Sequence, residues 1–209
     1  MDLLVLAKEP RPGRVKTRLC PPCTHQQAAA IAEAALADTL QAALASGADR
    51  VLLALDGDAG EWCPPGVEVV PQGGGDLADR LTASWRATTG PALQIGMDTP
   101  HVSSGVLRAS LERLQAPAVD AVLGLARDGG WWGIGFAGPA PPEVFRGIPT
   151  SQPDTGTRQD ERLRELGLRR ALLPPLVDVD TWVDALEVAS AHPALRFSAA
   201  VRAVEQGAG

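Results

Sequence analysis

The two lysines of this chain, Lys8 and Lys16, lie in one short segment, while the other seventeen basic residues are arginines. Residues 8–19 follow an apolar run, contain proline and glycine, and carry five cations and one anion, although the protein as a whole has a net charge of -6. An ammonium is a compact point charge, and a cluster of cations on an irregular loop suits a bound phosphate. The segment therefore predicts a phosphate-binding loop, with a solvated charged loop as the alternative.

This loop matches neither of the common glycine-rich phosphate motifs, GxxxxGK[ST] and GxGxxG. Its positive charge comes from side chains instead. Lys16 and Arg18 are two residues apart, so in an extended segment they would point to the same side. Two cations on one side favour a diphosphate or triphosphate as ligand.

A second ligand-binding segment is expected at Gln72-Gly73-Gly74-Gly75-Asp76. Glycine lets a backbone come close to a ligand, and the carboxamide of Gln72 could read a base edge. The alternative is a flexible connection in which Asp76 caps the next helix. We expect the nucleotide to contact residues of both segments, namely Ala7, Lys8, Gly13, Lys16, Arg18, Gln72, Gly75, Asp76 and Arg80.

Carboxylates that follow apolar runs predict a metal site. Asp98 follows one such run, and Asp178 and Asp180 alternate on what reads as a short last strand, so they would share one face. Mg²⁺ takes one or two carboxylates together with substrate phosphates and water, so Asp98 and Asp180 are the expected ligands of Mg²⁺ or Mn²⁺. Asp180 could alternatively cap the helix that begins at Thr181.

The second substrate is expected near the turn Asp128-Gly129-Gly130 and the two tryptophans after it, Trp131 and Trp132. Neighbouring strand residues face opposite sides, so at most one of these indoles can line a pocket. Asp128 is the best candidate for a general base, with His101 as the one histidine that could join it. Lys16, Asp98 and Asp128 are therefore the expected catalytic residues.

Apolar runs and helical patterns alternate along most of the chain, which predicts a three-layer α/β/α fold with a mainly parallel sheet. In such sheets ligands bind outside the carboxyl ends of the strands, where nearly all of these polar groups would lie. The expected strands are residues 3–7, 51–55, 67–70, 92–96, 119–125, 131–136 and 176–179, with an extended segment at 168–173. The expected helices follow Thr24, then span 76–88, 104–115, 157–166, 181–191 and 193–206.

Composition limits the function. A chain of 209 residues suits a single domain, and its acidity argues against binding to nucleic acid. With neither a membrane-spanning run nor a basic leader, the protein is expected to be cytoplasmic. Cys20 and Cys23 have CxxC spacing, but a turn before a helix is favoured over a redox or zinc role.

The chain resembles a bacterial group of GT-A-fold transferases that are labelled arsenosugar-biosynthesis-type or radical-SAM/selenodomain-associated. The resemblance is carried by residues 8–19, 72–80, 95–100, 120–136 and 177–181. More distantly, the first segment is similar to the phosphate loop of phospholactate guanylyltransferases. The chain departs from the pattern at Met97, at the tryptophan pair and near residues 149–151, where an expected tryptophan is missing.

The resemblance implies a nucleotide-diphospho-sugar-transferase-type domain that transfers a glycosyl group from a nucleotide-sugar to a small acceptor. A nucleotidyltransferase that uses an NTP and releases pyrophosphate is the first alternative, favoured by the positive charge of the first loop. A nucleotide-binding regulator without turnover is the second. The oligomeric state is not predicted by the sequence.

Overall fold

The computed structural model describes residues 1–207, and its centre is a seven-stranded sheet. The strand order is β3-β2-β1-β4-β6-β5-β7. Strand β6 runs antiparallel to both of its neighbours, whereas the other pairs are parallel. The strands are β1 (Asp2–Lys8), β2 (Arg50–Asp56), β3 (Val67–Pro71), β4 (Ala92–Gly96), β5 (Ala121–Ala126), β6 (Trp131–Phe136) and β7 (Arg170–Leu176).

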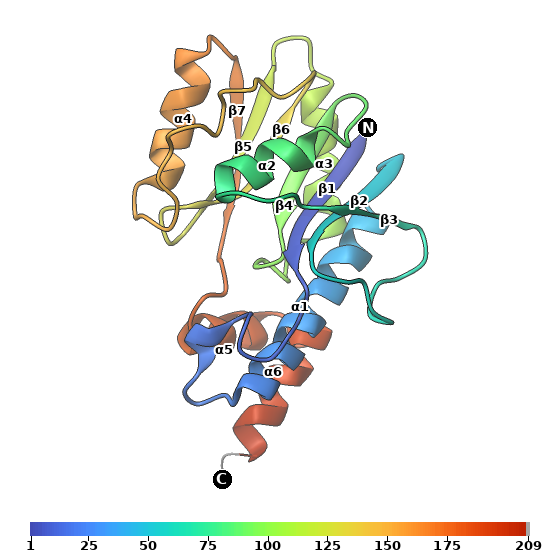
Figure 1. The fold of residues 1–209 in the computed structure, drawn as a ribbon, viewed down its shortest axis with the longest axis vertical. Coiled ribbons are helices and arrows are strands. Elements are labelled where there is room, and N and C mark those ends of the chain that lie inside the picture. The colour runs from blue at the N-terminus through green and yellow to red at the C-terminus, as the bar shows by residue number, and fades with distance from the viewer. Residues whose placement is uncertain (208–209) are drawn as a thin grey trace.

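Helices cover both faces of this sheet (Figure 1). One buried cluster joins the sheet to α1 and α3, and a second cluster joins the opposite face to α2 and α4. The helices are α1 (His25–Leu44), α2 (Leu77–Trp85), α3 (Ser104–Leu114), α4 (Thr155–Glu165), α5 (Trp182–Ala191) and α6 (Arg196–Gly207). The expected three-layer α/β/α architecture is therefore confirmed.

Side chains fix the starts of the helices as the sequence predicts. Thr24 caps α1 and Asp76 caps α2, each in a reciprocal capping box with the third residue of its helix. Ser103 caps α3 through its hydroxyl. These caps set where each helix leaves the loop that precedes it, and so they position the loops at the carboxyl ends of the strands.

The end of the sheet differs from the prediction. A single strand, β7, replaces the extended segment at 168–173 and the short strand at 176–179. Pro174 and Pro175 interrupt the expected pattern, but β7 is an edge strand, where a missing backbone N–H is tolerated. Asp178 and Asp180 consequently lie on an irregular segment after the sheet rather than on a strand.

A small helical layer lies beyond the carboxyl ends of the strands, at the bottom of Figure 1. Helices α5 and α6 pack against the first half of α1 around Phe197, Val201 and Leu19. The loop of residues 9–24 lies in this layer and contains a short 3-10 helix, Thr17–Leu19. Within residues 1–207 no helix is both long and apolar enough to span a bilayer.

Candidate functional site

A pocket of about 990 Å³ opens at the carboxyl ends of β1 and β4, between the sheet and the helical layer. This size suits a nucleotide-sized ligand, and the location is where open α/β sheets bind their ligands. Eleven charged residues from distant parts of the chain line it: Lys8, Arg14, Lys16, Arg18, Arg80, Asp98, Arg127, Asp128, Asp178, Asp180 and Asp184.

Lys16 occupies the centre of this charged region. Its ammonium forms an ion pair with Asp98, lies 3.9 Å from Oδ1 of Asp180, and donates to the carbonyl oxygen of Val179. The Lys16 side chain is buried, with only 6% of it exposed. The local backbone was predicted wrongly: Lys16 has a φ of 47° and precedes a 3-10 helix, so residues 16–18 are not extended.

Arg18 and Lys16 nevertheless reach the same carboxylate. Nη1 of Arg18 lies 3.0 Å from Asp180, and the Arg18 side chain is 68% exposed. Asp180 does not cap α5, because Thr181 is the N-cap and Asp184 completes the capping box. The carboxylate of Asp180 is thus held by the two cations of the basic loop, and the capping alternative is wrong.

Asp178 belongs to this site although the sequence prediction did not include it. Burial, together with the negative charges of Asp98, Asp128 and Asp180 and against the opposing charge of Lys16, raises its pKa to about 8. Backbone N–H of Val179 donates to the carbonyl oxygen of Asp98 at 2.9 Å, which holds this segment beside the end of β4. The alternation of Asp178 with Asp180 was the available signal.

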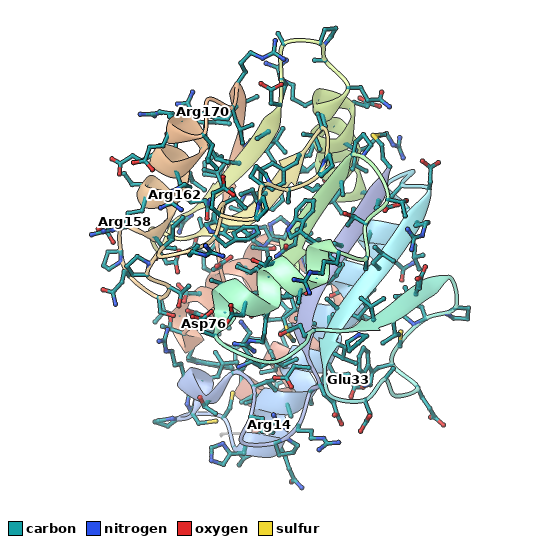
Figure 2. All side chains as sticks on the ribbon, turned by 45° about the horizontal axis from the view of Figure 1, so that its top comes forward. Arg14, Glu33, Asp76, Arg158, Arg162 and Arg170 are labelled. Carbon is teal, nitrogen blue, oxygen red and sulfur yellow. The ribbon has the colours of Figure 1, made fainter. Side chains whose placement is uncertain are left out.

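Further cations line the pocket around Asp56, at the end of β2. Arg14 lies 3.9 Å and Arg80 3.8 Å from its carboxylate oxygens, so one carboxylate lies near two arginines, one from the first loop and one from α2. Figure 2 labels Arg14 on the first loop and Asp76 at the start of α2. Lys8 is exposed and forms no ion pair with any residue of the described chain.

The glycine-rich segment contributes less than expected. Gln72 is buried, and its amide donates to the carbonyl oxygens of Ala7 and Ala54 while its oxygen accepts from Arg80. Its carboxamide is therefore engaged by the protein, which corrects the expectation that it is free to read a base. Gly13, Gly75 and Asp76 do not line the pocket, whereas Ala7, Gln72 and Arg80 do.

The turn at residues 128–130 places Asp128 in the same pocket as Asp98 and Lys16. Its Oδ1 accepts from the backbone N–H of Gly130 at 2.8 Å, which fixes the carboxylate without an ion pair to any described residue. Gly129 has a φ of 92°, and a Cβ there would collide with Pro153, so only glycine fits this turn. The start of α4 thereby holds the turn against the pocket.

The two tryptophans face opposite sides of the sheet, as expected. Trp132 is 2% exposed and donates through Nε1 to the carbonyl oxygen of Pro174 at 3.0 Å. Trp131 packs on the opposite face of the sheet, where it stacks with Phe145 at a centroid distance of 6.3 Å. Both nevertheless line the pocket, which corrects the expectation that at most one of them could, and Trp131 is the partly exposed one.

The carboxylates fit a hard divalent cation. Asp98 and Asp180 are 44% and 39% exposed and flank the same ammonium, so two oxygen ligands face one position in the pocket. Among residues 1–207 no group of three or more His, Cys, Asp or Glu residues is arranged to hold a metal ion. Two carboxylates completed by phosphate and water are the usual surroundings of Mg²⁺.

Other candidate residues lie apart from the pocket. His101 does not line it and instead packs against His192, with the ring centroids 5.0 Å apart. Cys20 and Cys23 are free thiols in the segment between the 3-10 helix and α1, and burial raises the pKa of Cys23. A raised pKa does not favour a reactive thiolate, which agrees with the favoured interpretation as a turn.

Solved structures with the same fold include nucleotide-using enzymes. A predicted nucleotide-diphospho-sugar transferase from Desulfovibrio desulfuricans G20 is 29% identical, with a TM-score of 0.85 over 98% of this chain and 96% of that one. A nucleotidyl transferase from Methanothermobacter is 21% identical, with a TM-score of 0.60 over 90% and 95%. Rv0371c of Mycobacterium tuberculosis H37Rv in complex with manganese is 23% identical, with a TM-score of 0.50 over 90% and 96%.

At the sequence level no curated protein matches the chain. A family match covers residues 26–152, which include β2 to β6, the metal-site candidate Asp98 and the turn of Asp128. The matched residues make up more than half of the chain. The chain therefore belongs to the family described as uncharacterized proteins conserved in bacteria, DUF2064.

Proposed function

We propose that this protein is a divalent-cation-dependent transferase that moves a glycosyl group from a nucleotide-sugar to a small acceptor. The observation that carries the proposal is the position of Lys16 between Asp98 and Asp180, in a pocket that basic side chains of two loops also line. Cations and carboxylates in one pocket suit the joint binding of a metal ion and phosphates. The similarity to the Desulfovibrio protein over nearly the whole chain supports this class.

In the proposed reaction an acceptor hydroxyl attacks the anomeric carbon of the bound sugar. The bond between that carbon and the diphosphate oxygen breaks, and a nucleoside diphosphate leaves. Lys16 and Arg18 stabilise the negative charge that develops on the departing diphosphate. The carboxylate of Asp128 takes the proton of the acceptor, directly or through one water.

A divalent cation held by Asp98 and Asp180 would supply charge neutralisation and orientation for the phosphates. The carboxylates also explain why Lys16 is placed as it is. Its ammonium offsets part of the negative charge of Asp98 and Asp180 in the protein alone. When phosphates are bound, the same ammonium can contact them.

Nucleotidyl transfer is the second candidate, because six cations line the pocket: Lys8, Arg14, Lys16, Arg18, Arg80 and Arg127. A triphosphate needs more positive charge than a metal-bound diphosphate. In this reaction a phosphate oxygen of the second substrate attacks the α-phosphate of an NTP, and pyrophosphate leaves with the electrons of the broken bond.

The test is a thermal-shift screen of the purified protein with the common NTPs and nucleotide-sugars, each with Mg²⁺, with Mn²⁺ and with EDTA. We expect stabilisation by at least one nucleotide-sugar that depends on the cation. Preferential stabilisation by an NTP would favour nucleotidyl transfer instead. Stabilisation by a nucleotide with no turnover on any acceptor would support the regulator, and no response to any nucleotide would contradict the whole proposal.

A further inference from the structure

One polar side chain interrupts a row of aliphatic residues across the middle of the sheet. In register, the row passes through Leu52, Leu4, Gln94, Ile134 and Leu123. Gln94 is 1% exposed, and the other four are fully buried. Side chains alternate along a strand, so Gln94 points to the face that carries α2 and α4. The other residues of the row are aliphatic, so a leucine would be expected at this position. The presence of a buried amide instead calls for an explanation.

The amide of Gln94 has no partner in the protein. Its Oε1 is buried without a hydrogen bond, and its nitrogen donates to no acceptor within residues 1–207. Two other buried glutamines of the pocket, Gln72 and Gln159, both donate to backbone carbonyl oxygens. Buried polar groups are almost always hydrogen-bonded, so an unpartnered amide beside a pocket indicates a partner that arrives with a ligand.

The next residue on the same face leaves room for that ligand. Gly96 follows Gln94 toward the carboxyl end of β4 and also lines the pocket. A Cβ built on Gly96 would meet only the backbone nitrogen of Asp98, at 3.9 Å. The floor of the pocket is therefore open between Gln94 and the carboxylate of Asp98.

Apolar side chains form the walls above this floor. We define the Gln94 lobe as the part of the pocket lined by Leu6, Leu77, Leu81, Gln94, Trp131 and Phe145. Leu6, Leu77 and Trp131 are only partly buried against the cluster that contains Leu81 and Phe145, so apolar surface faces the pocket. The stacked rings of Trp131 and Phe145 offer a flat wall for a ring.

We propose that the Gln94 lobe binds the second substrate, and that this substrate is an alcohol or phenol with an apolar, ring-sized body. The hydroxyl accepts from and donates to the amide of Gln94, while the body packs against Leu77 and Trp131. This inference rests on the proposed function, because it assigns the acceptor of that reaction to the side of the pocket that carries Asp128. A highly polar acceptor would leave this apolar surface unmatched.

The experiment compares two probes that differ by a hydroxyl, p-cresol and toluene. Binding is followed by saturation-transfer NMR and by backbone amide shifts of residues 94–98, without nucleotide. We expect p-cresol to bind the wild-type protein at least tenfold more tightly than toluene. In Gln94→Leu the preference should fall to about one, because toluene keeps its contacts and the hydroxyl loses its partner. Gln41→Leu, on the exposed side of α1, is the matched control and should keep the preference.

A structural role for Gln94 predicts a different result, namely lower stability of Gln94→Leu with an unchanged preference for p-cresol. That result, or equal binding of the two probes to the wild-type protein, would overturn the inference. If Gln94→Leu does not fold, Gln94→Met serves in its place. Displacement of p-cresol by a nucleotide would assign the lobe to the donor instead and would also overturn it. Nucleotide binding is measured separately in every variant, so failure of the lobe leaves the proposed function intact.

Discussion

The ammonium of Lys16 and the carboxylate of Asp98 form an ion pair between residues that are 82 positions apart in the chain, and the two side chains differ in exposure. Lys16 is 6% exposed and Asp98 is 44% exposed. The pair joins the first loop to the end of β4, and Lys16 also contacts the segment that carries Asp178 and Asp180. Lys16 therefore holds the site together in the protein alone, and under the proposed function it also contacts phosphates.

Lys16→Ala is accordingly expected to lower stability as well as nucleotide affinity. Removal of one partner leaves the carboxylates of Asp98 and Asp180 without their central cation, at a cost of about 1–3 kcal/mol in the free energy of unfolding. Urea unfolding without divalent cations measures this cost. Arg18→Ala is the control, because its exposed side chain should be needed for nucleotide binding but not for stability. Equal stability of wild type and Lys16→Ala would show that the pair contributes nothing to the fold.

The proposed metal site makes a separate prediction. Asp98→Asn and Asp180→Asn keep the shape of the side chain but remove a charged ligand, so Mg²⁺-dependent nucleotide binding should be lost in the first and weakened in the second, by tenfold or more. Calorimetric titration of nucleotide with and without Mg²⁺ measures the effect. Asp184→Asn is the comparison variant, because the carboxylate of Asp184 already completes the capping box of α5. Full Mg²⁺ dependence in the Asp98→Asn variant would exclude Asp98 as a ligand.

The general base is tested by Asp128→Asn. The amide oxygen can still accept from Gly130, so the turn should be kept while proton transfer is lost. We expect turnover to fall by about 10²–10⁴-fold with little change in nucleotide affinity. The measurement is donor turnover with an acceptor alongside a binding titration. A parallel loss of nucleotide affinity would indicate that Asp128 positions the donor instead.

The order of helices and strands could be predicted because buried parallel strands appear as apolar runs and helix caps have clear signals, as at Thr24, Asp76 and Ser103. The loops could not be predicted in the same way. Residues 16–18 read as extended by spacing alone, but Lys16 adopts a positive φ that depends on contacts with Asp98 and Val179, far along the chain. Similarly, an edge position makes Pro174 and Pro175 acceptable in β7, and edge position is a property of the whole sheet.

The candidate site was predictable to the extent that strand ends meet at one edge. For this reason one pocket contains Lys16, Asp98, Asp128 and Asp180, as their positions after apolar runs indicate. The raised pKa of Asp178 depends on burial and on charges from distant parts of the chain, so only its alternation with Asp180 marked it in the sequence. Gln94 did have a signal, since it is the one polar residue of a short apolar strand, but its significance appears only when its neighbours in the sheet are known.

The adjacent rings of His101 and His192 predict a pH dependence of stability. Burial, together with the nearby His192 and Arg127 and against the opposing charge of Glu187, lowers the pKa of His101 to about 4. In the unfolded chain a histidine takes up a proton near pH 6.5, so between pH 6.5 and 4 the unfolded state binds more protons than the folded state. Stability is therefore lost as the pH falls through this window and is unaffected by this residue above it.

His101→Phe keeps a ring against His192 but removes the titration. One pKa unit corresponds to about 1.4 kcal/mol, and the partial exposure of the ring reduces this effect. We therefore expect the free energy of unfolding of this variant to fall by about 1–2 kcal/mol less than that of wild type between pH 7 and pH 4.5. Urea unfolding at both pH values gives the loss of stability of each protein. Protonation of the carboxylates contributes equally to both losses, so it cancels when the two proteins are compared. His25→Gln, at the exposed first residue of α1, should behave as wild type. Identical losses in wild type and His101→Phe would mean that the imidazole of His101 is not kept neutral by the fold.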